Sequence, residues 1–250
     1  MSDSKFIDTP EGRRIAYHKT DGAGPCVVFL GGLKSDMMGT KAVYLEDWAR
    51  VEGRAFLRFD YSGHGESSGS FAEGCIGDWH EDTLAAVTAL TEGPLIVVGS
   101  SMGGWQALLL ARQWPERIAG LIGIAAAPDF TEDGYWANFT EAQKQTLAEV
   151  GQVELPSDYM EPYVITRRMI EDGRKRLVLR EALDLPFPVR LLQGTADTAV
   201  STATAVRLLE HAQSPDMQLT LVKDADHRFS DARCLAMIVA AINEVTGREG

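Results

Sequence analysis

The sequence is poor in the residues that mark several common classes of protein. It contains three cysteines in 250 residues, Cys26, Cys75 and Cys234, and no two of them stand in a Cys-x-x-Cys spacing. Disulfide-rich secreted domains and cysteine-based zinc sites need more thiols at closer spacing. We therefore expect neither a disulfide framework nor a bound metal.

Positive charge is also scarce, because 24 lysines and arginines face 36 aspartates and glutamates, a formal net charge of −12. A surface with this charge repels phosphate groups, so we expect no nucleic-acid partner. No apolar run is long enough to span a bilayer, and the opening residues, MSDSKFIDTPEGRR, lack the apolar core of a secretory signal. These absences predict a cytoplasmic protein without a membrane span.

Short apolar runs alternate with runs of helical periodicity along the first half of the chain. Strand-like runs occupy 14–20, 26–32, 54–60, 94–99 and 117–127, and helical runs occupy 40–53, 77–90 and 102–114. The run PLIVVG is apolar throughout, as in a parallel strand that helices cover on both faces. The alternation predicts an α/β fold with a mostly parallel central sheet and helices on both faces.

The alternation of strand-like and helical runs stops between about residues 128 and 186, where the pattern is helical and polar without a strand-like run. Thr140 and Gln143 have the spacing of a capping box, which predicts the start of a helix there. Residues 157–173 predict a second helix, and strands and helices alternate again from residue 188. We therefore expect one domain over residues 1–250 with a helical lid inserted at about 128–186.

Two adjacent serines stand between glycines in the stretch IVVGSSMGGWQALLL, residues 96–110. A nucleophilic serine on a sharp strand-to-helix turn is exposed near backbone N–H groups, and crowding in that turn requires small residues two positions before and after it. Ser101 meets this requirement with Gly99 and Gly103, whereas Ser100 has valine and methionine at those positions. Ser101 is therefore the predicted nucleophile, and Ser100 a small spacer.

The same Gly-x-Ser-x-Gly pattern recurs at residues 65–69. Polar residues precede that copy and no helical run follows it, so we expect a loop there. Ser101 has an apolar run before it and a helical run after it, which is the context that the motif requires. A glycine-rich turn without a chemical role is the alternative for Ser101.

A serine hydroxyl is a weak nucleophile that needs a histidine as base and a carboxylate to orient that histidine. In hydrolases with this turn, the acid and then the histidine follow the serine along the chain. Only His211 and His227 lie beyond the predicted insertion. His211 falls within a helical run, on its expected solvated face, so His227, just after the last strand-like run, is the predicted base.

The orienting acid should follow the strand-like run that precedes the last one. Asp197 is in that position, whereas Asp184 comes before the run. Asp224 and Asp226 stand three and one residues before His227, and carboxylates so close along the chain rarely turn back to orient the ring. Asp197 is therefore the predicted acid, and the other three are expected to have no part in the site.

An oxyanion hole needs two backbone N–H groups directed at the place where negative charge develops. One is expected from Met102, the residue after the nucleophile. The other is expected from the loop after an early strand, where Gly31 and Gly32 allow a close approach of the backbone. Leu33 is the candidate donor, with an ordinary glycine turn as the alternative.

Together these residues resemble those of the α/β-hydrolase superfamily. The stretch RFDYSGHGESSG carries Asp60, Gly63, His64 and Gly65 in a D-x-x-G-H-G pattern of that superfamily. The resemblance implies that this loop is structural or lines the pocket, with no catalytic role for His64. A closer resemblance, to the family of alpha/beta hydrolase domain-containing protein 10, rests on GGLKSDMMGTKA, VGSSMGGWQALLLA, QWPERIAGLIGIAAAPDF and DHRFS.

That family comprises serine esterases that act as palmitoyl-protein thioesterases and acyl-glucuronide esterases, without a cofactor. Here Gly31-Gly32 replaces the family's Pro-Gly, and the predicted lid matches less specifically, so the substrate does not carry over. No organelle-targeting extension precedes the matching region, which favours the cytoplasmic expectation.

We therefore expect a serine hydrolase that cleaves carboxylic esters or thioesters through an acyl-enzyme on Ser101. Its partner would be a small ester, an acyl thioester or an acylated protein. Lactone or C–C bond hydrolysis, perhydrolysis, and ligand binding without catalysis are the alternatives. Most of the lid aromatics are expected to pack the insertion onto the sheet rather than to contact an acyl chain. They are Tyr135, Trp136, Phe139, Tyr159 and Tyr163.

Overall fold

An eight-stranded sheet organises the part of the chain that a computed structural model describes, residues 3–155 and 163–247. The strands are, in their order across the sheet, β1 (Lys5–Asp8), β2 (Arg14–Thr20), β4 (Arg54–Phe59), β3 (Ala23–Leu30), β5 (Leu95–Ser100), β6 (Ile118–Ile124), β10 (Val189–Gly194) and β12 (Met217–Val222). β2 pairs antiparallel with β1 and with β4, and every other neighbouring pair is parallel. The predicted mostly parallel sheet is confirmed.

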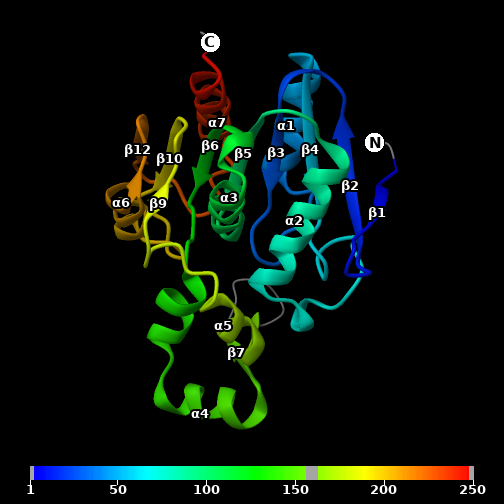
Figure 1. Ribbon diagram of the computed structural model, residues 1–250. Helices are drawn as coiled ribbons and strands as arrows, with labels where there is room; N and C mark the ends of the chain where they lie inside the picture. Colours follow the sequence, from blue (N-terminus) through cyan, green and yellow to red (C-terminus); the bar gives the residue numbers. More distant parts are fainter. Residues whose placement is uncertain (1–2, 156–162, 248–250) are drawn as a thin grey trace.

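Helices cover both faces of this sheet (Figure 1). Those on one face are α1 (Thr40–Val51) and α7 (Ala232–Val245), and those whose residues join the core of the other face are α2 (Ile76–Leu90), α3 (Met102–Gln113) and α6 (Thr202–His211). All six residues of β5 are buried between these layers. This double cover explains why residues 95–98 of the strand are all apolar instead of alternating with polar residues.

The predicted capping box begins α4 (Glu141–Val150). The Gln143 N–H donates to Thr140 Oγ1 at 3.2 Å, and the Thr140 N–H donates to Gln143 Oε1 at 2.9 Å. Ser201 and Asp231 cap α6 and α7 with their side-chain oxygens. Each cap satisfies N–H groups that the first turn of a helix leaves without a partner.

The segment from 128 to 186 contains strands, so the expectation of a purely helical insertion is wrong. Its elements are a π-helical turn η3 (Phe130–Trp136), α4, the antiparallel pair β7 (Gln152–Leu155) and β8 (Tyr163–Thr166), α5 (Arg167–Gly173), and β9 (Leu183–Asp184), which pairs with β11 (Ala212–Gln213). The helix expected at 157–173 begins only at Arg167, and its residues 157–162 lie outside the described part. Strands of four residues are too short for their periodicity to be recognised.

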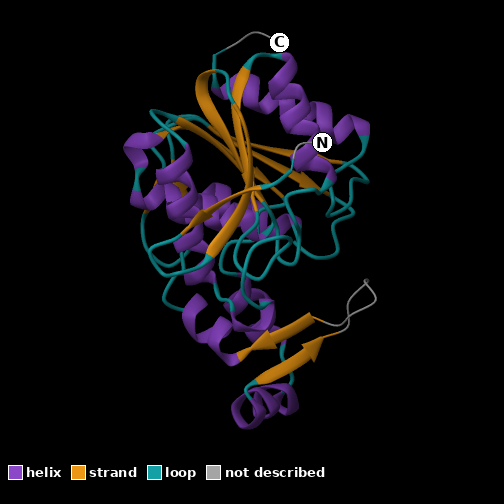
Figure 2. Ribbon diagram, turned by 90° about the vertical axis from the view of Figure 1, so that its right-hand side faces the viewer, coloured by secondary structure: helices purple, strands orange, loops and turns teal. Residues whose placement is uncertain are grey.

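Most of this segment, including α4, β7 and α5, lies beyond the carboxyl ends of the parallel strands (Figures 1 and 2). Asp129, with 0% of its surface exposed, holds the two ends of the segment together. Its carboxylate accepts hydrogen bonds from the Val178 N–H at 2.8 Å and the Leu179 N–H at 3.0 Å, and it pairs with Arg180 at 3.1 Å. The start of the segment is therefore tied to residues 178–180, close to its end.

A buried ion pair joins α1 to β4 and provides a test of the packing. Glu46 Oε2 lies 2.6 Å from Arg58 Nη2, and the two side chains are 7% and 4% exposed. Glu46→Leu should lower the free energy of unfolding by about 3–5 kcal/mol, because the Arg58 guanidinium stays buried without its counter-charge. Asp47→Leu removes an exposed ion pair with Arg50 on the same helix. This variant should change the free energy of unfolding by less than about 1 kcal/mol. Equal losses in urea denaturation of the two variants would contradict this account.

Three buried imidazoles predict how stability depends on pH. Burial lowers the pKa of His18, His64 and His80 below the ordinary value of about 6.5. The unfolded chain then binds protons at higher pH than the folded chain, so this stability is complete above about pH 6.5 and is lost as the pH falls through the lowered values. We expect the urea concentration at the midpoint of unfolding to decrease as the pH is lowered from about 7 to about 5. The decrease should be smaller in His80→Gln. An identical pH dependence in His80→Gln would exclude this ring as a contributor.

Candidate active site

Ser101 stands at the turn between β5 and α3 with φ of 55° and ψ of −118°. A positive φ is uncommon for a residue with a side chain and persists only where neighbouring contacts hold it. Here the Ser101 N–H donates to the Ile124 carbonyl at 2.9 Å, and the Ser101 carbonyl accepts from the N–H groups of Gly104 and Ala127 at 2.9 and 3.0 Å. The turn leaves Ser101 partly exposed beside a cavity.

The glycines that flank Ser101 are required by close backbone contacts. A Cβ on Gly99 would lie 2.3 Å from the Gly103 carbonyl oxygen, and a Cβ on Gly103 would lie 2.0 Å from the Leu30 carbonyl oxygen. Both distances are far shorter than van der Waals contact, so no larger residue fits without a backbone shift. The second copy of the motif, at 65–69, lies in the loop between β4 and the 3-10 turn η1 (Phe71–Glu73), as expected.

His227 lies between Ser101 and Asp197. Its Nε2 is 3.1 Å from Ser101 Oγ, and its Nδ1 is 2.8 Å from Asp197 Oδ2. A carboxylate only accepts, so the proton of a neutral ring belongs on Nδ1 and leaves Nε2 as the acceptor for the serine hydroxyl. The three predicted residues therefore form one hydrogen-bonded row, with the ring in the tautomer that general-base chemistry needs.

The Asp197 side chain is 0% exposed and is held by several donors. The N–H groups of Ala199 and Val200 each donate to Oδ1 at 2.8 Å, opposite the contact of Oδ2 with His227. Burial acts to raise the pKa of Asp197, but the hydrogen bonds from His227 and these N–H groups outweigh it and bring the pKa below its ordinary value. The carboxylate therefore stays ionised at neutral pH.

Gln193 is a member of the site that the sequence analysis missed. Its side chain is almost fully buried at the end of β10, where Nε2 donates to Asp197 Oδ2 at 3.0 Å and to the Val200 carbonyl at 3.0 Å. The amide thus fixes both the acid and the loop around it. The available signal was a buried-strand position with a polar residue, Gln193, directly after Leu191 and Leu192 near the end of VRLLQG.

The rejected candidates lie elsewhere, as expected. His211 is the last residue of α6, where its Nε2 is 2.7 Å from a backbone carbonyl. Asp226 accepts a hydrogen bond from an N–H of its own loop at 3.1 Å, and Asp184 lies in β9. Among the described residues that line the cavity, these three and Asp224 do not occur.

A cavity of about 400 Å³ opens beside Ser101 and His227, a volume within the range of small-molecule sites. Much of its wall comes from the 128–186 segment, through Phe130, Tyr135 and Tyr163 among others. Both tyrosines also pack against the hydrophobic core, as expected for most aromatics of this segment, and contact with an acyl chain stays untested. Phe139 is buried and Trp136 lies 4.5 Å from the Arg174 guanidinium, while Tyr159 lies outside the described residues.

Leu33 and Met102, the predicted oxyanion donors, both line this cavity next to Ser101. Met102 is the first residue of α3, so its N–H has no acceptor within the helix. Leu33 follows Gly32, where an added Cβ would lie 3.4 Å from the Ser101 Cβ. The strand end before Leu33 therefore approaches the serine as closely as the prediction requires, and the role of both N–H groups stays a prediction.

Within residues 3–155 and 163–247, no group of three or more His, Cys, Asp or Glu side chains could hold a metal ion. Within the same residues, no helix is both long and apolar enough to cross a bilayer.

The sequence is similar to those of known proteins. Residues 25–171 match the protein family described as serine aminopeptidase, S33. The chain is 35% identical to palmitoyl-protein thioesterase ABHD10, mitochondrial, of Rattus norvegicus, over 96% of this chain and 81% of that protein.

Solved structures give the same result. A protein of Agrobacterium vitis S4 superposes with a TM-score of 0.93 at 38% identity and covers 97% of this chain and 98% of its own. Alpha/beta hydrolase domain-containing protein 10 from mouse gives a TM-score of 0.91 at 34% identity, over 98% and 99% of the two chains. The chain therefore belongs to the α/β-hydrolase superfamily and, within it, to the family of alpha/beta hydrolase domain-containing protein 10.

Proposed function

We propose that this protein is a serine hydrolase that cleaves carboxylic esters or thioesters through an acyl-enzyme on Ser101. The observation that carries the proposal is the row of Ser101, His227 and Asp197, with contacts of 3.1 and 2.8 Å, at the edge of a cavity. A serine hydroxyl aligned with a neutral, carboxylate-bound imidazole is the arrangement that activates serine for attack on an acyl carbon.

In the acylation step, Ser101 Oγ attacks the carbonyl carbon of the substrate while His227 Nε2 takes the hydroxyl proton. The ionised Asp197 stabilises the imidazolium that results. The carbonyl oxygen becomes an oxyanion, and the N–H groups of Leu33 and Met102 donate hydrogen bonds to it. When the intermediate collapses, the imidazolium gives its proton to the departing alcohol oxygen or thiol sulfur, and the acyl group remains on Ser101.

Deacylation repeats these steps with water as the nucleophile. His227 Nε2 takes a proton from the water, whose oxygen attacks the acyl carbon, and the same two N–H groups receive the second oxyanion. Collapse breaks the bond to Ser101 Oγ, which recovers its proton from His227. The products are a carboxylic acid and the free enzyme.

The substrate proposed here is a small ester, an acyl thioester or an acylated protein. The apolar and aromatic wall formed by Phe130, Leu155 and Tyr163 suits the acyl part of such a substrate, and a relative is named a palmitoyl-protein thioesterase. In this proposal residues 1–250 form one domain with the 128–186 segment as its lid. We keep the cytoplasm as the proposed location and note that the same relative is named mitochondrial.

Hydrolysis of p-nitrophenyl esters and acyl thioesters of increasing chain length tests the proposal. We expect turnover with both classes and a preferred chain length set by the cavity. Turnover of lactones, C–C substrates or peroxide without ester hydrolysis would replace this proposal with another reaction of the fold.

Ser101→Ala should lower ester hydrolysis by at least about 10⁴-fold and abolish labelling by a fluorophosphonate probe, because the attacking oxygen is lost. Ser100→Ala is the matched control, since it removes the neighbouring hydroxyl of the same motif. We expect Ser100→Ala to keep turnover within about threefold and to keep labelling. If Ser101→Ala retained turnover or labelling, the nucleophile would be another residue.

Asp197→Asn should lower kcat by about 10²–10⁴-fold. The amide can donate to Nδ1 and so favours the ring tautomer with its proton on Nε2, which then cannot accept the Ser101 proton. Asp224→Asn removes a carboxylate from the loop that carries His227 and serves as the control, with kcat expected within about threefold. Steady-state kinetics on one ester measure both. Equal kcat values for the two variants would remove Asp197 from the mechanism.

A further inference from the structure

The loop after β3 must hold its conformation without a regular element to support it. Within residues 31–39, the Ser35 N–H donates to the Gly32 carbonyl at 3.1 Å, and the Gly39 N–H donates to the Asp36 carbonyl at 3.2 Å. Lys34 has φ of 57°, a conformation that is uncommon for a residue with a side chain. An oxyanion donor stabilises charge effectively only if it is already aimed before the reaction. The loop therefore needs support from outside.

His64, from the D-x-x-G-H-G stretch, supplies one such support. Its Nε2 lies 3.1 Å from the Lys34 backbone nitrogen, and its Nδ1 lies 3.1 Å from the Ser62 carbonyl oxygen. A backbone N–H only donates and a carbonyl only accepts, so Nδ1 carries the proton and Nε2 is the acceptor. Both contacts together are possible only for the neutral ring, and burial lowers the pKa of His64 in the same direction.

The imidazole has little freedom to turn. It is 4% exposed, and the rings of Tyr61, Phe71 and Trp79 surround it with centroids 5.7, 5.4 and 5.2 Å away. All three rings meet it edge to face, a favourable arrangement for aromatic pairs. The acceptor at Nε2 is thus fixed in space as well as in protonation.

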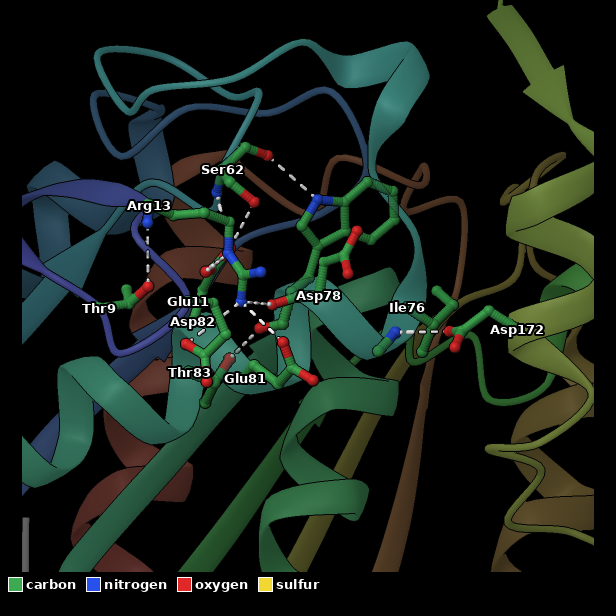
Figure 3. Close-up of polar contacts among 12 residues, drawn as sticks. Thr9, Glu11, Arg13, Ser62, Ile76, Asp78, Glu81, Asp82, Thr83 and Asp172 are labelled. Atoms are coloured by element: carbon green, nitrogen blue, oxygen red, sulfur yellow. Dashed lines mark hydrogen bonds and ion pairs between the residues drawn. The ribbon is translucent and has the colours of Figure 1, made fainter.

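The carbonyl that holds His64 is itself anchored to α2 (Figure 3). The Ser62 N–H and hydroxyl both donate to Asp82 Oδ2, at 2.8 and 2.6 Å, while Arg13 Nε donates to Asp82 Oδ1 at 2.6 Å. Trp79 Nε1 also donates to the Ser62 carbonyl at 3.1 Å. Asp82 is 0% exposed. A continuous row of hydrogen bonds therefore runs from Arg13 through Asp82, Ser62 and His64 to the backbone of Lys34.

We propose that His64 is a positioning residue, whose imidazole holds the Lys34 N–H and thereby aims the preceding Leu33 N–H at the oxyanion. The inference rests on the proposed function of the Ser101 site. His64 does not touch the reacting atoms in this account. It acts through the peptide unit next to the donor, and its effect belongs to the transition state rather than to substrate binding.

Two replacements of His64 separate its two contacts. Gln places an amide oxygen near the position of Nε2 and can still accept from Lys34, whereas Asn reaches only the position of Nδ1 and can still donate to Ser62. His80→Leu is the control for the loss of a buried histidine. His80 lies in α2 and is buried like His64, but it contacts Gln113 and not the loop after β3.

We expect His64→Asn and His64→Leu to lower kcat by about 10–10³-fold with KM within about threefold, as for a misplaced oxyanion donor. Ser101 Oγ adds to the carbonyl carbon of an alkyl trifluoromethyl ketone and gives a tetrahedral oxyanion. The dissociation constant of this inhibitor should rise in both variants by the same factor as kcat falls. His64→Gln should recover at least about tenfold of the loss, and His80→Leu should keep kcat within about threefold at a similar loss of thermal stability.

Equal kcat for the Gln and Asn variants, or equal kcat losses in His64→Leu and His80→Leu, would overturn the proposal. The Gln and Asn variants decide the matter if His64→Leu does not fold. Failure of the positioning role is distinguishable from failure of the proposed function. In the first case Ser101→Ala is inactive while the His64 variants keep kcat, and in the second case Ser101→Ala itself stays active.

Discussion

The close approach of α3 to the end of β3 governs the geometry of the whole site. Because a Cβ on Gly103 would lie 2.0 Å from the Leu30 carbonyl oxygen, the first turn of the helix can rest on that strand only with glycine there. The contact holds the β5–α3 turn, in which Ser101 has a positive φ, against the end of β3. It also brings the residues after Leu30, including Leu33, to the side of the serine. The contact between Gly103 and Leu30 thus places the Ser101 hydroxyl and the N–H groups of Leu33 and Met102 at the same cavity.

The base and the acid depend on a second close approach, between the loops that follow β10 and β12. A Cβ on Gly194 would lie 2.1 Å from the Ala225 carbonyl oxygen, and the Ala196 N–H donates to that carbonyl at 3.0 Å. The loop bearing His227 is thereby held against the loop bearing Asp197. Residues about 30 positions apart along the chain meet because their parallel strands are neighbours in the sheet.

The sequence was sufficient for the parts of the site that follow from local rules and chain order. The Gly-x-Ser-x-Gly spacing around Ser101 can be read within five residues, although the contact that requires Gly103 is with Leu30. The order of serine, acid and histidine follows from the strand order. The contacts of His64 with Lys34 and of Ser62 with Asp82 join residues 30 and 20 positions apart. The hydrophobic periodicity of a sequence does not predict contacts between such distant residues. The D-x-x-G-H-G stretch could therefore be recognised in the sequence, but the contacts of His64 could not be predicted.

The 128–186 segment was the least predictable part for a related reason. β7 and β8 pair with each other and not with the central sheet, and each is only four residues long. Asp129 holds residues near the two ends of the segment together. Further hydrogen bonds tie the segment to the body, from the Gly77 N–H to Asp172 and from Trp105 to the Arg176 carbonyl. The segment supplies much of the cavity wall, whereas the three hydrogen-bonded residues of the site come from loops of the central sheet. Substitutions in the cavity wall can therefore change which acyl groups fit and leave the reacting groups in place.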